Sequence, residues 1–336
     1  RAVTAPHRDR PALGDMLQRQ SARLPSDAAR AQSLQTLRGS DAVVVVTGQQ
    51  VGWLGGPAYT LVKALAAVEL AQRITAQGVP TIPVFWMASG DHDLDEVATA
   101  PTLDGPAVRL NLEDRGGPVG GIELPVDVDE AREQWLSLLP TSVRESARTL
   151  SQSYRAGQTL ADAFAQTLAE LTAGTGLLLF DSRDPSLARW ARPIFERELL
   201  GEEPARDLLL ASPEPHVVPV DRDVTQVFYV DDAGRRQRLA RTDAGVSWGD
   251  DSLDRESLTA ALADSPARFS PAALLRPIVQ DHVLPTVATL AGPTERRYLA
   301  PMQALYVWAA AVPSPVVQRQ ALFPIAAARK NSVSRT

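Results

Sequence analysis

The feature of this sequence that most constrains its fold is an apolar block at residues 42–47, in which four consecutive valines follow Ala42. A strand with one face in solvent alternates polar and apolar side chains, and this block does not. Valine is also common in strands, because its branched side chain packs well on a pleated surface. The block therefore predicts a strand that is buried on both faces of a parallel sheet, as in α/β proteins.

The segments after this block complete a strand–helix–strand unit. A loop with four glycines occupies residues 48–57, and residues 58–77 carry apolar side chains at helical spacing. Residues 79–86 form the next strand candidate. Parallel strands joined by a helix are connected by a right-handed crossover, so this unit predicts the start of a parallel sheet.

Later segments extend the α/β pattern. Residues 175–181 again form an apolar strand that ends in a polar residue, and the glycines of residues 101–139 indicate an inserted segment. Helices are expected at 12–20, 27–37, 129–138, 150–171, 185–200, 272–282 and 294–311, a further strand at 286–290, and a β-hairpin at 217–239.

Composition excludes several classes of function. With 336 residues the chain is long enough for two domains or for one domain with a large insertion. It has no cysteine, which excludes disulfides, cysteine-ligated metal sites and thiol nucleophiles. It has 34 Lys and Arg residues and 40 Asp and Glu residues, which give a net charge of −6. This charge argues against general electrostatic binding to nucleic acid or anionic lipid.

The sequence also shows no membrane or export signal. The longest apolar run, residues 305–312, is far shorter than the about 18 residues that a membrane span needs. The N-terminal residues lack the apolar core of a signal peptide. We therefore expect a cytoplasmic protein whose partners include neither nucleic acid nor a membrane.

The glycine loop is the first candidate site. Between a buried strand and a helix N-terminus, glycines let backbone N–H groups approach an anion, and the helix dipole adds about half a positive charge. The glycines, at positions 48, 52, 55 and 56, match neither the Walker A loop nor the dinucleotide-binding fingerprint. Tyr59 and Lys63 project from one helix face, with the Thr60 hydroxyl beside them. The loop thus predicts a phosphate or carboxylate site; the alternative is a tight turn before an ordinary helix.

The second candidate site is the run Ser-Gly-Asp-His-Asp-Leu-Asp-Glu at residues 89–96, just after the second strand. Ligands of open α/β sheets bind outside the carboxyl ends of the strands, which places this run beside the glycine loop. Asp91, Asp93, Asp95 and Glu96 could hold Mg²⁺ through one or two carboxylates, or orient His92 as a general acid or base. The alternative is a solvated acidic loop whose aspartates cap a helix.

Two more polar groups stand at the ends of expected elements. Arg276 could bind a carboxylate or phosphate through two parallel hydrogen bonds, and a structural ion pair is the alternative. Gly292-Pro293 follows the strand at 286–290 and fits a strand-to-helix turn. That turn places Glu295 at a helix N-terminus.

Together these segments resemble a known family. Thr-Gly-Gln-Gln-x-Gly-x-x-x-Gly-Pro-x-Tyr-Thr-x-x-Lys at 47–63 and Pro-Val-Phe-Trp-x-Ala-Ser-x-Asp-His-Asp at 83–93 resemble the cysteine-adding enzymes, or cysteine ligases, of bacillithiol biosynthesis. Leu-Arg-Pro-x-x-Gln-Asp at 275–281 and Gly-Pro-x-Glu-x-x-Tyr at 292–298 are similar to the same family and occur in the same order.

The resemblance implies a Rossmann-like parallel-sheet core with inserted connecting segments. It also implies the addition of cysteine to glucosaminyl malate, which yields the low-molecular-weight thiol bacillithiol. Amide formation needs an activated carboxyl group, so we expect ATP with Mg²⁺ to form a cysteinyl adenylate or phosphate. The roles assigned on this basis are cofactor binding for Gly48, Gln49, Gln50, Gly55, Tyr59 and Thr60, catalysis for Lys63, Asp91, His92 and Asp93, metal binding for Asp91 and Asp93, and substrate binding for Arg276 and Glu295.

The same resemblance divides the chain. Family members continue into a C-terminal coiled coil that forms a homodimer, and we expect that coiled coil to be absent here. The expected parts are a helical lead-in (1–40), the first half of the core (41–100), an inserted segment with helices (101–174), a core α/β unit (175–212), an insertion with a β-hairpin (213–268), the last part of the core (269–320) and a polar tail (321–336).

Two other functions stay open at this point. One is a truncated, inactive relative that only binds a nucleotide or a sugar ligand. The other is a metal-dependent phosphohydrolase built on the Asp-His-Asp run at 91–93, which leaves the glycine loop without a role.

Overall fold

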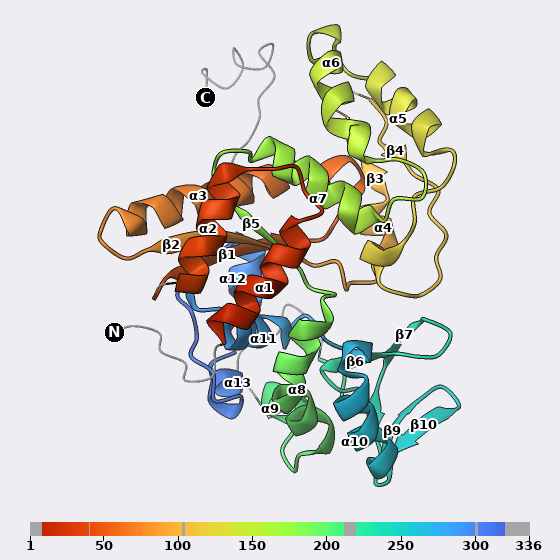
Figure 1. The fold of residues 1–336 in the computed structure, drawn as a ribbon. Helices are drawn as coiled ribbons and strands as arrows, with labels where there is room; N and C mark the ends of the chain where they lie inside the picture. Colours follow the sequence, from red (N-terminus) through yellow and green to blue (C-terminus); the bar gives the residue numbers. More distant parts are fainter. Residues whose placement is uncertain (1–8, 40, 103–104, 212–219, 300–301, 320–336) are drawn as a thin grey trace, which may run out of the picture.

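A five-stranded parallel sheet forms the centre of the molecule (Figure 1). The computed structural model describes residues 9–39, 41–102, 105–211, 220–299 and 302–319. The strand order is β13-β12-β1-β2-β5, and all neighbouring strands are parallel. This confirms the predicted Rossmann-like α/β fold. The strands are β1 (Val43–Gln49), β2 (Thr81–Met87), β5 (Leu178–Asp181), β12 (Thr286–Ala291) and β13 (Val316–Gln318).

The valine block forms the central strand β1, between β2 and β12. Val44 and Val46 pack into the core on one face of the sheet, and Val45 packs on the opposite face. All three side chains are fully buried. Burial on both faces explains why this strand has no alternation of polar and apolar residues.

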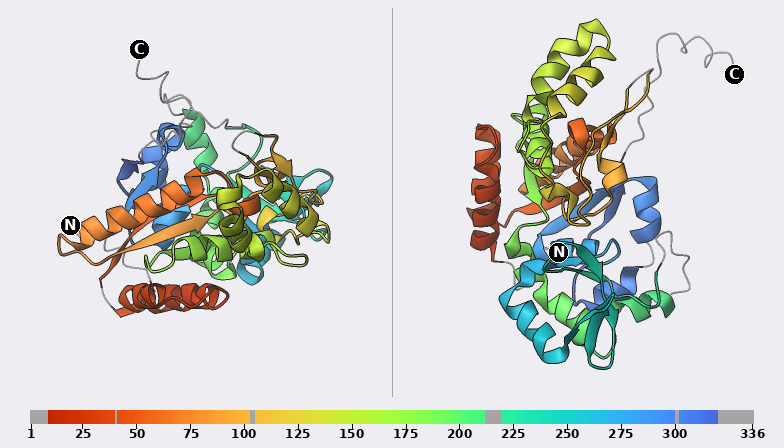
Figure 2. Two further views of the ribbon diagram at one scale, coloured as in Figure 1. Left: turned by 90° about the horizontal axis from the view of Figure 1, so that it is seen from above. Right: turned by 90° about the vertical axis from the view of Figure 1, so that its right-hand side faces the viewer.

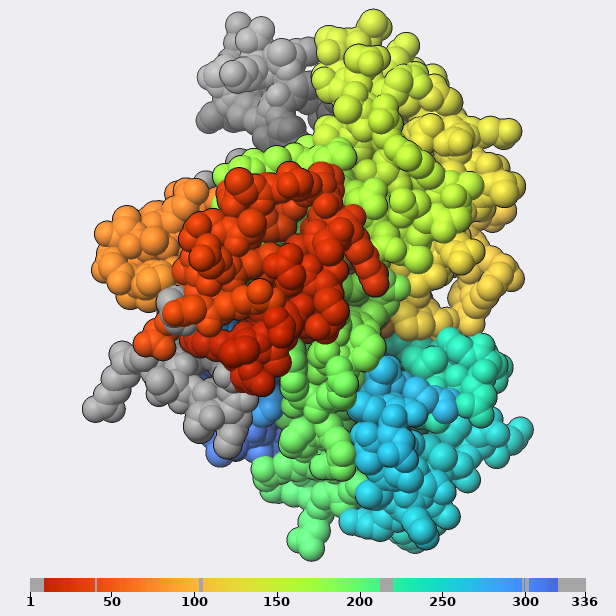
Figure 3. Space-filling view, in the orientation of Figure 1, coloured from red at the N-terminus to blue at the C-terminus, as the bar shows by residue number. Residues whose placement is uncertain are grey.

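Helices cover both faces of the sheet. Val44 and Val46 share their core with several helices, among them α1 (Arg10–Ser21), α2 (Ala28–Gly39), α8 (Pro185–Leu200) and α11 (Arg276–Val283). Phe85, on the other face, packs with α3 (Tyr59–Thr75) and α7 (Leu160–Leu171). Figure 2 shows the α1–α2 pair and α3 on opposite sides of the sheet, and Figure 3 shows the α1–α2 pair covering the front.

Two insertions extend from the sheet, at the top and bottom of Figure 1. The first, between β2 and β5, contains α4 (Leu94–Val97), β3 (Thr99–Ala100), β4 (Val108–Arg109), α5 (Val128–Ser137), α6 (Thr141–Leu150) and α7. The second, between α8 and α11, contains α9 (Ala205–Ala211), β6 (Val227–Val230), β7 (Arg236–Arg238), β8 (Ala240–Arg241), β9 (Gly245–Trp248), β10 (Asp251–Asp254), α10 (Arg255–Asp264) and β11 (Phe269–Pro271). The predicted hairpin is present as the antiparallel pair β6–β7.

Two predicted helices differ in the structure. The predicted helix 150–171 begins only at Leu160, as α7, because the chain forms a 3-10 turn at Ser151–Ser153 and turns again at Gly157, where φ is +78°. The helix before it, α6, ends at Leu150 and was not predicted. The predicted helix 294–311 is two helices, α12 (Pro293–Leu299) and α13 (Gln303–Trp308). Pro301 lies between them in the sequence, and proline cannot continue a helical hydrogen-bond ladder. The predicted polar tail, 321–336, lies outside the described residues.

Among the described residues, no helix is both long and apolar enough to cross a bilayer.

A buried carboxyl group holds the second insertion against α8. Glu198 is fully buried and accepts hydrogen bonds from the backbone N–H groups of Ala205 (2.5 Å) and Gln226 (2.7 Å). Burial raises the pKa of Glu198, although these hydrogen bonds oppose the shift. The folded state therefore favours the protonated acid, so its contribution to stability is complete at low pH and falls as the pH rises through the raised pKa.

We expect Glu198→Gln to lower the free energy of unfolding at neutral pH by about 1–3 kcal/mol, because the new NH₂ group faces one of the two N–H donors. The variant should also lose the part of the pH dependence that comes from this titration. Urea unfolding of both proteins across a pH series measures both effects. Equal stability and identical pH profiles would contradict the assigned role.

Candidate functional site

A cavity lies where the strand order reverses. From β1 the chain adds β2 and β5 on one side of the sheet, and it then adds β12 and β13 on the other. Ligands of open α/β sheets bind at such a switch point, outside the carboxyl ends of the strands. A cavity of about 510 Å³ is found there, and we call it the switch-point cavity. Its polar and charged lining includes Gly48, Gln49, Gln50, Tyr59, Lys63, Asp91, Glu96, Arg276, Gln280, Glu295 and Arg319.

Lys63 is the most enclosed charge in the switch-point cavity. Its side chain is 7% exposed, and Nζ donates to the backbone oxygen of Gly48 (2.9 Å) and to Oε1 of Gln49 (3.0 Å). Nζ also forms an ion pair with Oε2 of Glu295 at 3.0 Å. Burial lowers the pKa of Lys63, and the Glu295 carboxylate opposes that shift. Lys63 thus joins the end of β1 to the start of α12 and holds a positive charge between them.

The two glutamines after β1 connect the glycine loop to the acidic run. Nε2 of Gln49 donates to Oε1 of Glu96 (3.4 Å), and Nε2 of Gln50 donates to Oδ2 of Asp91 (2.7 Å). Because Gln49 also accepts from Lys63, its amide bridges the cation and a carboxylate. The two predicted sites are therefore in direct contact and form one site.

Asp91 forms a small network with groups from distant parts of the chain. Its Oδ1 accepts from the backbone N–H of His92 (2.8 Å) and lies 3.9 Å from Nη1 of Arg236, on β7 of the second insertion. Burial favours the protonated carboxyl group, but hydrogen bonds from His92 and Gln50 and the charge of Arg236 outweigh it. The pKa of Asp91 is therefore well below its ordinary value, and this carboxylate stays charged.

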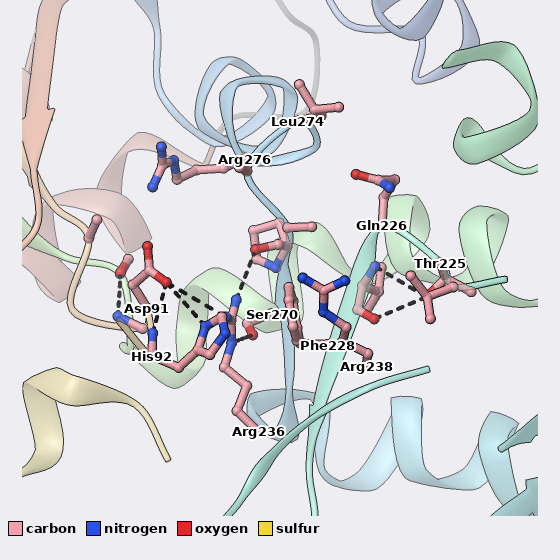
Figure 4. A pocket seen from close by; sticks show the side chains of 18 of the residues that line it. Asp91, His92, Thr225, Gln226, Phe228, Arg236, Arg238, Ser270, Leu274 and Arg276 are labelled. Atoms are coloured by element: carbon pink, nitrogen blue, oxygen red, sulfur yellow. Dashed lines mark hydrogen bonds and ion pairs between the residues drawn. The ribbon is translucent and has the colours of Figure 1, made fainter. Parts of the chain in front are cut away.

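A second pocket, drawn in Figure 4, shares part of its lining with the first. It has a volume of about 200 Å³, and we call it the insertion pocket because β6, β7 and β11 form one side of it. Trp86, Ala88, Asp91 and Arg276 line both spaces. His92 lines the insertion pocket only. The predicted substrate residue Arg276 thus stands at the junction of the two pockets.

Three predicted site residues lie outside both cavities. The N–H of Gly55 donates to Oη of Tyr154 (2.7 Å), and φ of +87° marks Gly55 as a turn residue. Thr60 is buried beneath the glycine loop, where its Oγ1 has no hydrogen-bond partner within the described chain. Asp93 is exposed and caps α4 by accepting from the N–H of Glu96 (3.1 Å). The turn and capping alternatives thus describe the structural roles of Gly55 and Asp93.

The carboxylates do not form a metal site on their own. In the described parts of the chain, no three His, Asp or Glu side chains gather as metal ligands. Magnesium is commonly held by one or two carboxylates together with substrate phosphates. Of the predicted pair, Asp91 lies on the cavity wall and Asp93 does not, so the residues present do not fit a protein-built Mg²⁺ site.

Tyr154 stabilises the glycine turn through two hydrogen bonds to its backbone. It is fully buried, donates to the backbone oxygen of Gly52 (2.9 Å) and accepts from the N–H of Gly55. We expect Tyr154→Phe to lower the free energy of unfolding by about 1–3 kcal/mol, because both backbone groups lose a buried partner. Chemical denaturation measures this change, and an unaltered midpoint and slope would show that the turn does not depend on the hydroxyl.

Two charged residues of the site were not predicted, Arg236 and Arg319, which lie on segments that the motifs do not cover. Glu96 was named with the acidic run as a possible Mg²⁺ ligand, and it lines the switch-point cavity. Arg319 follows β13 and stacks over the ring of Tyr59 at 3.7 Å. Arg236 had a usable signal, because residues two apart on the predicted hairpin share one face and Arg238 is also cationic.

Comparisons with known proteins agree with this architecture. The model of a family described as "Bacillithiol biosynthesis BshC, N-terminal Rossmann-like domain" matches residues 2–320. The chain is 34% identical over 328 residues to a protein of Salinibacter ruber named "Putative cysteine ligase BshC", covering 90% of this chain and 58% of that protein. A protein of the same name from Koribacter versatilis is 37% identical over 83% of this chain and 54% of its own length. The chain therefore spans between half and two thirds of the length of these relatives.

Proposed function

Because the chain belongs to the BshC family of bacillithiol biosynthesis proteins, we propose that it adds cysteine to glucosaminyl malate in an ATP-dependent amide ligation. In this reaction a bond forms between the sugar amine and the cysteine carbonyl carbon. The bond from that carbon to its activating group breaks, and the amine gives up a proton. One observation supports the proposal most: two polar pockets meet at Asp91 and Arg276, at the switch point of a Rossmann-like sheet.

The cations of the switch-point cavity are the groups that suit the phosphates of ATP. Lys63, Arg276 and Arg319 line it together with the carboxylates of Asp91, Glu96 and Glu295. Lys63 pairs with Glu295 and not with a carboxylate of the acidic run. A buried cation with a fixed position stabilises negative charge without having to reorganise. ATP supplies the driving force for activation, and we assign its phosphate contacts to Gly48, Gln49, Gln50, Tyr59 and Lys63. No step of this proposal passes through a metal ion.

Glu96 is the best placed acceptor for the amine proton. It lines the switch-point cavity, and burial together with the nearby charges of Asp93 and Asp91 raises its pKa. A carboxylate with a raised pKa takes up a proton more readily than Asp91, whose pKa is low. We therefore assign proton acceptance to Glu96 and electrostatic positioning to Asp91.

A substitution of Arg276 tests substrate binding separately from the stability of the fold. Within the described chain its guanidinium forms no hydrogen bond or ion pair, so Arg276→Gln should change the free energy of unfolding by no more than about 0.5 kcal/mol. We expect kcat/KM to fall about tenfold or more, because a charged hydrogen bond to substrate is lost. Steady-state kinetics with a parallel melting curve measures both. A fall in stability that accounts for the lost activity would show a structural role instead.

The proposed function is tested by calorimetry followed by a product assay. We expect heat of binding with ATP and with glucosaminyl malate, and bacillithiol formation that requires cysteine. Ligand heat without product would favour the inactive binding relative. Release of phosphate from simple esters with Mg²⁺, without cysteine, would favour the phosphohydrolase.

A further inference from the structure

The insertion pocket has a wall rich in hydrogen-bond donors. Arg236, Arg238 and Arg276 all line it, and Figure 4 shows these side chains around one space together with Phe228 and His92. The carboxylates on the same wall are Asp91 and Asp221. Three guanidinium groups against two carboxylates leave the lining with a net positive charge. A pocket of about 200 Å³ is smaller than the roughly 300–1,000 Å³ of sites for drug-sized ligands, so it suits a small anionic group.

Arg236 is the fixed part of this wall. Its side chain is 6% exposed, and Cζ lies 3.6 Å above the centre of the Phe228 ring. Nε donates to Oγ of Ser270 (3.3 Å), and Nη1 lies 2.8 Å from Nδ1 of His92. Burial lowers the pKa of Arg236 to about 10, so the group stays cationic at neutral pH. Its hydrogen bonds are thus used within the protein, and Arg236 shapes the pocket.

His92 lies between Arg236 and Asp91 in this wall. Its Nδ1 is 2.8 Å from Nη1 of Arg236 and 3.3 Å from Oδ1 of Asp91. A guanidinium group donates and a carboxylate accepts, so the protonation of Nδ1 decides which of the two contacts is a hydrogen bond. The His92 ring thus connects the cation of the wall to its carboxylate.

Arg238 and Arg276 are the cations left for a ligand. Arg238 is 60% exposed and lies 3.9 Å from the half-exposed carboxylate of Asp221, which is a weak surface pair. Arg276 forms no hydrogen bond or ion pair within the described chain and also reaches the switch-point cavity. Planar guanidinium groups match the two oxygens of a carboxylate.

We propose that the insertion pocket binds a small carboxylate ligand through Arg238 and Arg276, with Arg236 and His92 completing the wall. The identity of the ligand rests on the proposed function: the pocket holds the malate end of glucosaminyl malate. The sugar amine then lies toward the wall shared with the switch-point cavity, where Asp91 and Arg276 stand. The second insertion thus supplies the recognition of the acceptor's acid group.

Calorimetry of the full chain with two sugar probes tests this site. One probe is glucosaminyl malate, and the other is methyl glucosaminide, which has the same sugar without the carboxylates. We expect the unaltered protein to bind the first probe at least about tenfold more tightly than the second. Arg238→Gln should remove most of that preference and leave ATP binding unchanged. Arg73→Gln, a loss of the same charge at an exposed position of α3, is the matched control.

The outcomes separate this proposal from the proposed function. Equal affinity for both probes, or an unchanged preference in Arg238→Gln, would overturn the carboxylate site and leave the ligase assignment standing if cysteine-dependent product still forms. Binding of glucosaminyl malate that is weakened in Arg238→Gln, without any product, would support the carboxylate site and count against the ligase. Equal weakening in Arg73→Gln would show a general charge effect and overturn the site.

Discussion

Replacing Lys63 with methionine is expected to lower bacillithiol formation by at least about a hundredfold. Methionine fills much of the volume of lysine but removes the charge that we assign to the ATP phosphates, and loss of one fixed donor at a site of developing charge costs about 10²–10³ in rate. The charge is also part of the ion pair with Glu295 and of the hydrogen bonds to the end of β1. Turnover with saturating ATP and cysteine measures the effect.

A second variant separates this functional role from a structural one. Lys63→Met alone leaves the Glu295 carboxylate without its cation, and we expect a loss of about 1–3 kcal/mol in the free energy of unfolding. Adding Glu295→Gln removes the unpaired charge and should restore most of that stability. Activity should remain lost in the double variant. Recovery of turnover together with stability would show that Lys63 serves the fold and not the reaction.

The Glu96→Gln variant is expected to reduce kcat by about a hundredfold or more, the usual range for loss of a general base. The effect should depend on pH. Glu96 accepts a proton only when ionised, so the rate of the unaltered enzyme should fall as the pH drops through its raised pKa. In Glu96→Gln that acidic limb should be missing. A pH series of kcat for both proteins makes the measurement.

Asp95 provides the matched control for Glu96. It belongs to the same acidic run, is 85% exposed and pairs with Arg109 rather than facing a cavity. Asp95→Asn should therefore leave kcat and its pH profile unchanged. If Asp95→Asn and Glu96→Gln lose activity equally, the effect comes from the charge of the run as a whole, and the assignment of Glu96 fails.

The core of the fold could be predicted because local sequence and burial agree there. The valines of β1 are buried on both faces, and the glycines after them occupy a turn in which Gly55 and Gly56 have positive φ. The small strands β8, β9 and β10 gave no comparable signal. They are two to four residues long, and β10 has only one side chain that is not exposed, so packing leaves little pattern in their sequence.

The candidate site could be predicted where its residues follow a strand of the sheet. It was harder to predict where the residues belong to distant segments of the chain. Lys63 was found because it stands in the first turns of α3, the helix that follows β1, and Asp91 because it stands just after β2, at the edge where parallel strands end. Their partners lie far along the chain. The spacing of nearby residues therefore predicts neither the pairing of Lys63 with Glu295 nor that of Asp91 with Arg236. The sequence could not distinguish Gly55 and Asp93 from binding residues, because a turn and a helix cap need the same residue types as a binding site.

The central claim is that the switch-point cavity binds the phosphates of ATP at Lys63, and a crystal structure of the full chain with ATP tests it most directly. We expect phosphate oxygens within hydrogen-bond distance of Nζ of Lys63, with the nucleotide between the ends of β1 and β12. Nucleotide bound elsewhere on the molecule, with the Lys63–Glu295 pair intact and the cavity free of phosphate, would contradict the claim.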